Sequence, residues 1–305
     1  MTATLRQTFS AMGSPCSLQL WAYDSGTAQQ AAAAAQAEVA RLEQRYSRYR
    51  PDSLTQRINT CAGDPDGIEV DAETAGLLDY AALAWRHSDG LFDLSTGSLR
   101  RLWDFRAGQL PTPAQREAAL ALVGWQRLIW QAPRLILPQP GMEIDLGGVV
   151  KEYAADAAAA QARAAGARGG YIDLGGDLRV FGPQADGQAW SIGIRHPLQP
   201  GKVMAHLQLR SGGLATSGTM ERGFHHQGER LHHLLSPFTA WPVATLASIT
   251  VVAPQCLVAG TAATTALLMG AQAGPAWLQA QQAHWLGITE GGQRCGSALA
   301  RQAAA

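Results

Sequence analysis

The spacing of apolar residues along the chain predicts a mixture of helices and strands. Residues Ala28 to Tyr46 carry apolar side chains at helical spacing, whereas Ser17 to Ala22 alternate polar and apolar side chains as a half-buried strand does. Capping residues mark two further helix starts, one after Asp71 and one at Thr112, where a first-turn proline and a capping-box glutamine follow. Further strands are expected at 128–130, 135–137, 190–194, 203–209 and 248–252, and further helices at 257–269 and 275–283.

The middle of the chain repeats one short pattern, Ile-Asp-Leu-Gly-Gly, at Ile144–Gly148 and Ile172–Gly176. Each copy is expected to be a strand that ends in paired glycines. The first copy leads into a helix over 150–165, and the second continues as a strand to Phe181. Because glycine lets the backbone approach a phosphate closely, the two strand ends are able to form one anion-accepting wall. Ordinary turn glycines explain each copy almost as well.

The order of these elements favours an α+β fold with mixed sheets and packed helices. Strands and helices mix without the strict alternation of a doubly wound parallel sheet. No linker-like stretch of low complexity divides the 305 residues. We therefore expect residues 1–305 to form a single domain, built as one unit or as two intimately packed halves.

Composition narrows the range of partners. The 24 basic and 24 acidic residues cancel, so no overall charge attracts the chain to nucleic acid or to an anionic membrane. The stretch Leu231–Thr289 has no charged residue, but four prolines and several polar side chains make it unsuited to a spanning helix, and we expect no membrane insertion. Without an apolar run of signal length at its start, the chain is expected to be cytoplasmic. The four cysteines form no C-x-x-C pair, which argues against a zinc site.

Lys151 is one of only two lysines in the chain and follows the paired glycines of the first repeat. A cation in the first turn of a helix is well placed to meet a phosphate held by the preceding loop. The plain alternative is a surface lysine. The spacing of a Walker loop is absent, so a nucleotide site of that kind is not predicted.

Histidines and one aspartate are the other candidates for chemistry. Four of the eight histidines lie within nine positions: His225, His226, His232 and His233. Histidine binds metals and transfers protons near neutral pH, so the cluster is a candidate site, and the exposed tip of a hairpin around Gly228 is the alternative. Asp93 follows Phe92 and either binds ring or sugar hydroxyls or caps a turn.

Taken in order, these blocks resemble the FAD:protein FMN transferase (ApbE-like) family from Met12 to Met269. The matching segments are Ala11–Ser14, Tyr46–Ser53, Asp89–Asp93, Gly97–Leu99, Trp103–Phe105, Ile144–Asp156, Leu174–Asp177, Ala215–Gly218, and His233 with Pro237 and Pro242. Such enzymes bind FAD and, with magnesium, move its FMN half onto a threonine or serine hydroxyl of a target protein, releasing AMP. The resemblance implies an ApbE-like flavin transferase fold, FAD as the ligand and a flavin-acceptor protein as the partner.

The resemblance also implies a set of site residues. The residues that would line the FAD site are Met12, Tyr49, Leu91, Phe92, Asp93, Asp145, Lys151 and Leu235. His233 becomes the candidate for proton handling near the pyrophosphate. The backbone oxygen of Gly148 and the hydroxyl of Thr264 become the candidate magnesium ligands.

One position departs from the family pattern. A family segment of the form Ala-Asp-Ala-x-x-Thr carries a metal-binding aspartate, and this chain has Gly260 at that position while keeping Thr264. An aspartate placed at 260 is expected to point into the same pocket as Thr264, because the two positions share one helical face. The alternative is that Gly260 is a close-packing glycine, where a buried aspartate without a cation would destabilise the fold. Two readings follow. The chain is an active transferase in which Asp145, Thr264 and a nearby carboxylate such as Asp173 or Asp177 support magnesium, or it is an FAD carrier, sensor, chaperone or pyrophosphatase that has lost transfer.

Overall fold

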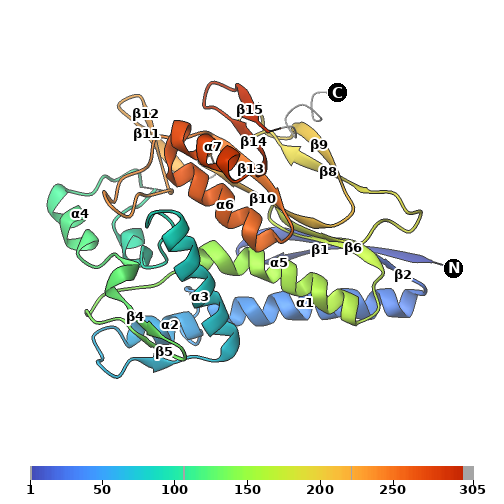
Figure 1. Ribbon diagram of the computed structural model, residues 1–305, viewed down its shortest axis with the longest axis horizontal. Coiled ribbons are helices and arrows are strands. Elements are labelled where there is room, and N and C mark those ends of the chain that lie inside the picture. The colour runs from blue at the N-terminus through green and yellow to red at the C-terminus, as the bar shows by residue number, and fades with distance from the viewer. Residues whose placement is uncertain (1, 106, 221, 298–305) are drawn as a thin grey trace.

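The computed structural model of the protein describes residues 2–105, 107–220 and 222–297. Its centre is an eight-stranded antiparallel sheet with the strand order β1-β2-β6-β7-β10-β13-β14-β15 (Figure 1). The strands are β1 (Ala3–Ala11), β2 (Ser14–Ala22), β6 (Gly169–Leu174), β7 (Asp177–Phe181), β10 (Gly212–Gly218), β13 (Ser248–Ala253), β14 (His284–Ile288) and β15 (Arg294–Gly296). The α+β fold class expected from the element order is confirmed.

Three helices cover one face of this sheet. They are α1 (Ser25–Tyr46), α5 (Gly147–Ala164) and α6 (Cys256–Leu268), with α5 lying between the other two (Figure 1). The opposite face is covered by a separate hairpin, β8 (Trp190–Arg195) and β9 (Val203–Leu209). The sheet therefore has a hydrophobic core on each face, and successive side chains of a strand point into different cores. On β10, Leu214 packs under the hairpin and its neighbour Ala215 packs under the helices.

Smaller elements gather at the other end of the molecule. A three-stranded sheet, ordered β3-β5-β4, lies near α2 and α3 (Figure 1). The remaining elements are α2 (Leu54–Thr60), β3 (Ile68–Glu69), α3 (Ala72–His87), α4 (Pro113–Leu120), β4 (Ile129–Gln131), β5 (Arg134–Ile136), β11 (Gly223–His226), β12 (Glu229–His232), α7 (Gly270–Ala280) and the 3-10 turns Gly97–Arg101 and Trp125–Arg127.

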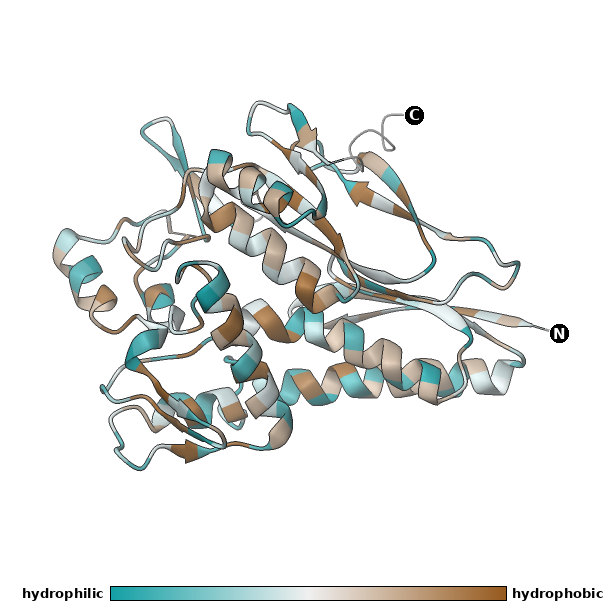
Figure 2. Ribbon diagram, viewed as in Figure 1, coloured by the Kyte–Doolittle hydropathy of each residue, from teal (hydrophilic) through white to brown (hydrophobic). Residues whose placement is uncertain are grey.

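Alanine forms the contact between α1 and α5. The buried alanines on the two helices are Ala28, Ala31, Ala32, Ala35, Ala154, Ala155, Ala158, Ala159 and Ala162. Small side chains let two helices approach closely, and dense packing of this kind transmits a displacement of one helix to the other. Helix α6 is white to brown along its length in Figure 2, as expected for a helix that carries no charged residue. Within the described ranges, no helix combines the length and the apolar run that crossing a bilayer requires.

Asp156 of α5 caps the start of α6. Its Oδ1 accepts a hydrogen bond from the Cys256 N–H and its Oδ2 accepts one from the Leu257 N–H, each at 3.0 Å. The residue at the N-cap position, Gln255, makes no side-chain cap of its own. One carboxylate from a neighbouring helix therefore satisfies two of the N–H groups that a helix start leaves unpaired.

Most predicted elements are present with shifted ends, and several were missed. The capping box predicted at Thr112 is present at the start of α4. The elements that were not predicted include β1, α2, β3, β10, β14 and β15. The stretch 144–146, predicted as a strand, is a loop: the Asn59 side chain bonds both the N–H and the carbonyl of Ile144, which supplies the partners that a neighbouring strand would give. The following helix begins at Gly147 rather than at 150.

Replacing the α6 cap tests this arrangement. Asp156→Ala leaves two N–H groups at the start of α6 without their carboxylate, and we expect the free energy of unfolding to fall by about 2 kcal/mol. Asp186→Ala, at an exposed turn, is the control and is expected to change it by less than about 0.5 kcal/mol. Urea unfolding of both variants measures the difference, and equal midpoints would show that the cap contributes nothing.

Candidate active site

The start of α5 is the centre of the candidate site. Gly147 and Gly148 are exposed there, and the residue at the N-cap position, Leu146, makes no side-chain cap. The Gly147 N–H donates to Asp145 Oδ1 at 2.9 Å. First-turn N–H groups and the positive end of the helix dipole favour a bound anion, and glycine leaves the backbone open to approach.

The loop that follows α3 packs against this helix start. A side chain at Gly148 would begin 3.5 Å from the Phe92 ring, so the ring lies directly against the glycine. Asp93, in contrast, is turned inward. Its Oδ1 accepts from the Ser95 N–H and hydroxyl at 2.7 and 2.6 Å, and its Oδ2 accepts from the Trp125 N–H at 2.8 Å. These bonds give Asp93 the turn-capping role that its position in the sequence also allowed.

Lys151 extends from the first turn of α5 to the sheet. Its Nζ lies 2.5 Å from Asp177 Oδ2, at the first residue of β7, and the Thr216 N–H donates to Asp177 Oδ1 at 3.3 Å. Asp177 is buried, and burial raises the pKa of its carboxyl while the Lys151 ammonium opposes the rise. The lysine side chain is 30% exposed, so the ammonium bridges the interior and the open side of the site.

Thr264 of α6 contacts β10, the strand that pairs with β7. Its hydroxyl is 2.7 Å from the hydroxyl of Ser217 on β10, and Ser217 follows Thr216 directly. Two hydroxyl oxygens and a buried carboxylate therefore come together where α6 meets the sheet. No three His, Cys, Asp or Glu side chains within the described chain group closely enough to hold a metal ion, which excludes a zinc-type cluster there.

Glu152 occupies the space beside Gly260. A Cβ built on Gly260 would lie 2.5 Å from Glu152 Cγ and 2.7 Å from its Oε1. Glu152 is 6% exposed, and its Oε2 has no hydrogen-bond partner. Burial raises the pKa of the Glu152 carboxyl well above its usual range, and the nearby Asp177 carboxylate raises it further.

The structure supports the second alternative for position 260, a close-packing glycine, over an open site for a metal ligand. An aspartate at Gly260 would not point into open space, because its first side-chain atom would collide with Glu152. The space beside Gly260 already contains a carboxylate, and it belongs to Glu152 of α5 and not to a residue of α6. The sequence reading missed Glu152. Only its spacing, one helical turn after Gly148, could have indicated that it faces the same way as the predicted site.

Two turns extend the site on the α1 side. Arg48 bonds the Asp145 carboxylate and lies 3.7 Å from Glu143 Oε2. The adjacent Tyr49 is 71% exposed, and the Arg100 guanidinium lies 4.9 Å from its ring centroid. Met12 forms the tight turn between β1 and β2, with a φ of +51°.

The Met12 N–H donates to Glu43 Oε1 of α1 at 2.7 Å, which fixes this turn on the helix.

The four clustered histidines are divided between two environments. His225 and His226 lie on β11 beside the turn at Gly228, so the hairpin alternative describes them. His232 is buried at the end of β12. His233 follows it and is half-buried, with Nδ1 3.3 Å from the Arg222 carbonyl oxygen.

A carbonyl oxygen only accepts, so in neutral His233 this contact places the proton on Nδ1 and the lone pair on Nε2. Leu235 follows two residues later, half-buried and bridged to Pro242.

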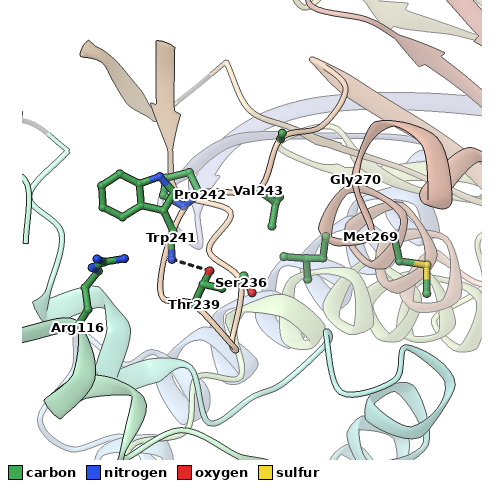
Figure 3. Close-up of a pocket in the computed structure, with 10 residues that line it drawn as sticks. Arg116, Ser236, Thr239, Trp241, Pro242, Val243, Met269 and Gly270 are labelled. Carbon is green, nitrogen blue, oxygen red and sulfur yellow. Dashed lines mark hydrogen bonds between the residues drawn. The ribbon is translucent and has the colours of Figure 1, made fainter. Parts of the chain in front are cut away.

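A cavity of about 690 Å³ opens next to this segment. It lies between α4, the loop 236–244 and the end of α6, and Figure 3 shows Trp241 and Arg116 on one side and Met269 on the other. The Arg116 guanidinium carbon lies 4.9 Å from the centroid of the Trp241 ring. None of the residues predicted from the sequence to bind FAD lines this cavity, although Leu235 immediately precedes Ser236 on its wall.

Comparisons with known proteins agree with this fold. The model of the ApbE family matches residues 12–286, and the chain belongs to that family. A protein of Klebsiella pneumoniae named FAD:protein FMN transferase is 31% identical over 281 residues, which are 89% of this chain and 84% of that protein.

Solved structures give the same result. The crystal structure of the ApbE protein from Thermotoga maritima has a TM-score of 0.86 at 28% identity and covers 97% of both chains. The Pseudomonas stutzeri flavinyl transferase ApbE has a TM-score of 0.84 at 26% identity, over 96% of this chain and 93% of that chain.

Because of His232, the stability of the fold is predicted to depend on pH. The Nε2 of His232 lies 3.0 Å from the Val243 carbonyl and its Nδ1 accepts from the Leu234 N–H at 3.3 Å, so the neutral ring fits and a second proton does not. Burial, with a smaller effect of His233, lowers the pKa of His232 to about 4 from 6.5. Between these values the unfolded chain binds the extra proton, so stability is lost as the pH falls.

We expect this residue to contribute on the order of 3 kcal/mol to the loss of unfolding free energy between pH 7.5 and pH 4. His232→Gln should flatten that slope, while His225→Gln, exposed on the hairpin, should keep it. Chemical denaturation across the pH range makes the measurement. A wild-type slope in His232→Gln would mean that the buried ring does not set the acid sensitivity.

Proposed function

We propose that this chain is an FAD:protein FMN transferase, which moves FMN from FAD onto a threonine or serine hydroxyl of a target protein and releases AMP. The observation that carries the proposal is the start of α5, where exposed glycine backbone, the helix dipole and Lys151 converge. Membership of the ApbE family and the name of the Klebsiella relative support the same activity.

The proposed position of FAD follows from this helix start. The pyrophosphate lies against the first turn of α5, with its charge opposed by Lys151, and the Phe92 ring beside Gly148 offers an apolar surface for a ring of the ligand. The full proposed lining is Met12, Tyr49, Leu91, Phe92, Asp93, Asp145, Lys151 and Leu235. Within it, Asp93 acts by holding the loop in shape, since its oxygens are bonded internally.

The proposed reaction is one displacement at phosphorus. The acceptor hydroxyl oxygen forms a bond to the FMN phosphorus of FAD, the bond from that phosphorus to the bridging oxygen breaks, and AMP leaves with that oxygen. The hydroxyl proton must pass to a base as the bond forms, and we assign this role to His233 through Nε2. Negative charge grows on the phosphate oxygens during the step, where the α5 N–H groups and Lys151 oppose it.

We propose magnesium as the cation of this site, with Thr264 and the backbone oxygen of Gly148 among its ligands. Magnesium prefers oxygen ligands and is held in proteins by one or two carboxylates together with waters and substrate phosphates. The residues present suit it: paired hydroxyls lie at Thr264 and Ser217, and a buried carboxylate oxygen without a partner lies at Glu152. When bound, the cation supplies charge neutralisation at the pyrophosphate.

One assay separates this function from an FAD carrier or pyrophosphatase. The chain is incubated with FAD, Mg²⁺ and host-cell extract, and the products are analysed for AMP and for flavin fluorescence that survives on a denaturing gel. A transferase gives both signals, and both disappear with EDTA. AMP without protein-bound flavin indicates a pyrophosphatase, and neither product, with FAD still bound, indicates a carrier. Either of these last two results would overturn the proposal.

Lys151 provides a matched test of the FAD position. Lys151→Gln keeps a donor toward Asp177 but removes the charge, and we expect FAD binding to weaken at least about tenfold, since a charge-assisted hydrogen bond contributes roughly 1.5–3 kcal/mol. Lys202→Gln removes the only other lysine, which is exposed before β9, and should bind FAD as the wild type does. A fluorescence titration compares the two. Equal affinities would place the pyrophosphate elsewhere.

A further inference from the structure

We propose that Glu152 is the carboxylate ligand of the divalent cation in this chain, supplied from α5 in place of a side chain at position 260 of α6. This inference deepens the proposed function and rests on it for the substrate that shares the cation. It concerns which side chain of this molecule binds the metal.

The first observation is the fit between Glu152 and Gly260. The Cγ, Cδ and Oε1 atoms of Glu152 lie 2.5–2.9 Å from the point where a Gly260 side chain would begin. Real atoms do not approach so closely, so the glycine is required for the glutamate to occupy this space. The two residues are complementary. Position 260 of α6 has no side chain, and the Glu152 carboxylate of α5 fills that space.

The second observation is the state of that carboxylate. Glu152 is only 6% exposed, and its Oε2 is without a hydrogen-bond partner. Lys151, the adjacent cation, is paired with Asp177. A buried carboxylate oxygen that lacks a donor is costly to the fold, and a bound cation is one of the few groups that satisfies it.

The third observation is the set of oxygens around Glu152. Gly260 and Thr264 are one helical turn apart, which places their side-chain positions about 6 Å from each other. The Thr264 hydroxyl is bonded to Ser217, and the preceding residue, Thr216, donates its N–H to Asp177. Asp177 is close enough to Glu152 for the two carboxylates to interact. One carboxylate, two hydroxyls and the open coordination positions of a bound substrate make a donor set of the kind that magnesium takes.

Metal binding itself is the first readout. Mn²⁺, a spectroscopic substitute for Mg²⁺, is titrated into the full chain with and without FAD and followed by electron paramagnetic resonance, and the shift in melting temperature is recorded with Mg²⁺. We expect the wild type to bind Mn²⁺ and to melt higher with Mg²⁺ through linkage. Glu152→Gln, which keeps the size of the side chain, should lose at least tenfold in Mn²⁺ affinity and lose the Mg²⁺ shift.

Two further variants make the test decisive. Glu73→Gln is the matched control, since Glu73 is a partly buried glutamate on α3 bonded to Arg41 and Tyr153, and it should bind Mn²⁺ as the wild type does. The double variant Glu152→Gly with Gly260→Asp returns the carboxylate to α6 and should regain Mn²⁺ binding. Gly260→Asp alone should melt lower than the wild type, because its side chain meets Glu152.

The outcomes separate this proposal from the proposed function. If Glu152→Gln binds Mn²⁺ and responds to Mg²⁺ as the wild type does, Glu152 is not a ligand, whatever the transfer assay gives. The same conclusion follows if the wild type binds no Mn²⁺ with FAD present. If Mn²⁺ binding depends on Glu152 but the wild type releases no AMP and labels no protein, the ligand assignment stands and the transferase function fails.

Discussion

Helix α5 packs between α1 and α6, and this packing determines where the candidate site lies on the sheet. Buried alanines line the contact with α1, so the helix has little freedom to shift, and its exposed start is held at a fixed place on the sheet. Three residues within two turns of this helix then make contacts with different elements. Lys151 reaches β7, Glu152 reaches Gly260 on α6, and Asp156 caps the start of α6.

This arrangement concentrates buried charge at one crossing of secondary structure. Asp177 and Glu152 are both buried, and a single ammonium, that of Lys151, is paired with the first of them. Charged groups are costly to bury, and apolar side chains of similar size at the same positions often give an equally stable or more stable fold. The presence of these charged groups in a region with raised carboxyl pKa values, next to an exposed helix start, is typical of a functional site.

The sequence predicted what is local and missed what depends on distant contacts. The α4 capping box needs only Thr112 and Gln115, three residues apart, and it was predicted correctly. The contact of Glu152 with Gly260 depends on the crossing of α5 and α6, and these two residues lie more than a hundred positions apart in the sequence, so no local pattern indicates it. The loop at Ile144 was mistaken for a strand for the same reason, because its hydrogen-bond partner is the side chain of Asn59.

The family resemblance indicated which positions belong to the site, but it did not indicate which side chains surround each of them. It indicated Asp93 as a ligand residue, yet the carboxylate is bonded to Ser95 and Trp125. It also indicated a missing metal ligand at Gly260, where the structure has a neighbouring glutamate in the same space. In both cases the neighbouring side chains, which depend on the fold, assign the residue a different structural role from the one that the resemblance implied.

We propose that FAD binds with its pyrophosphate at the start of α5. A crystal structure of the full chain grown with FAD would show where the pyrophosphate lies. We expect phosphate oxygens within hydrogen-bonding distance of the first-turn N–H groups of α5 and of Lys151 Nζ. Density for FAD in the cavity beside Trp241 and Arg116, with no phosphate at Gly147 and Gly148, would contradict it.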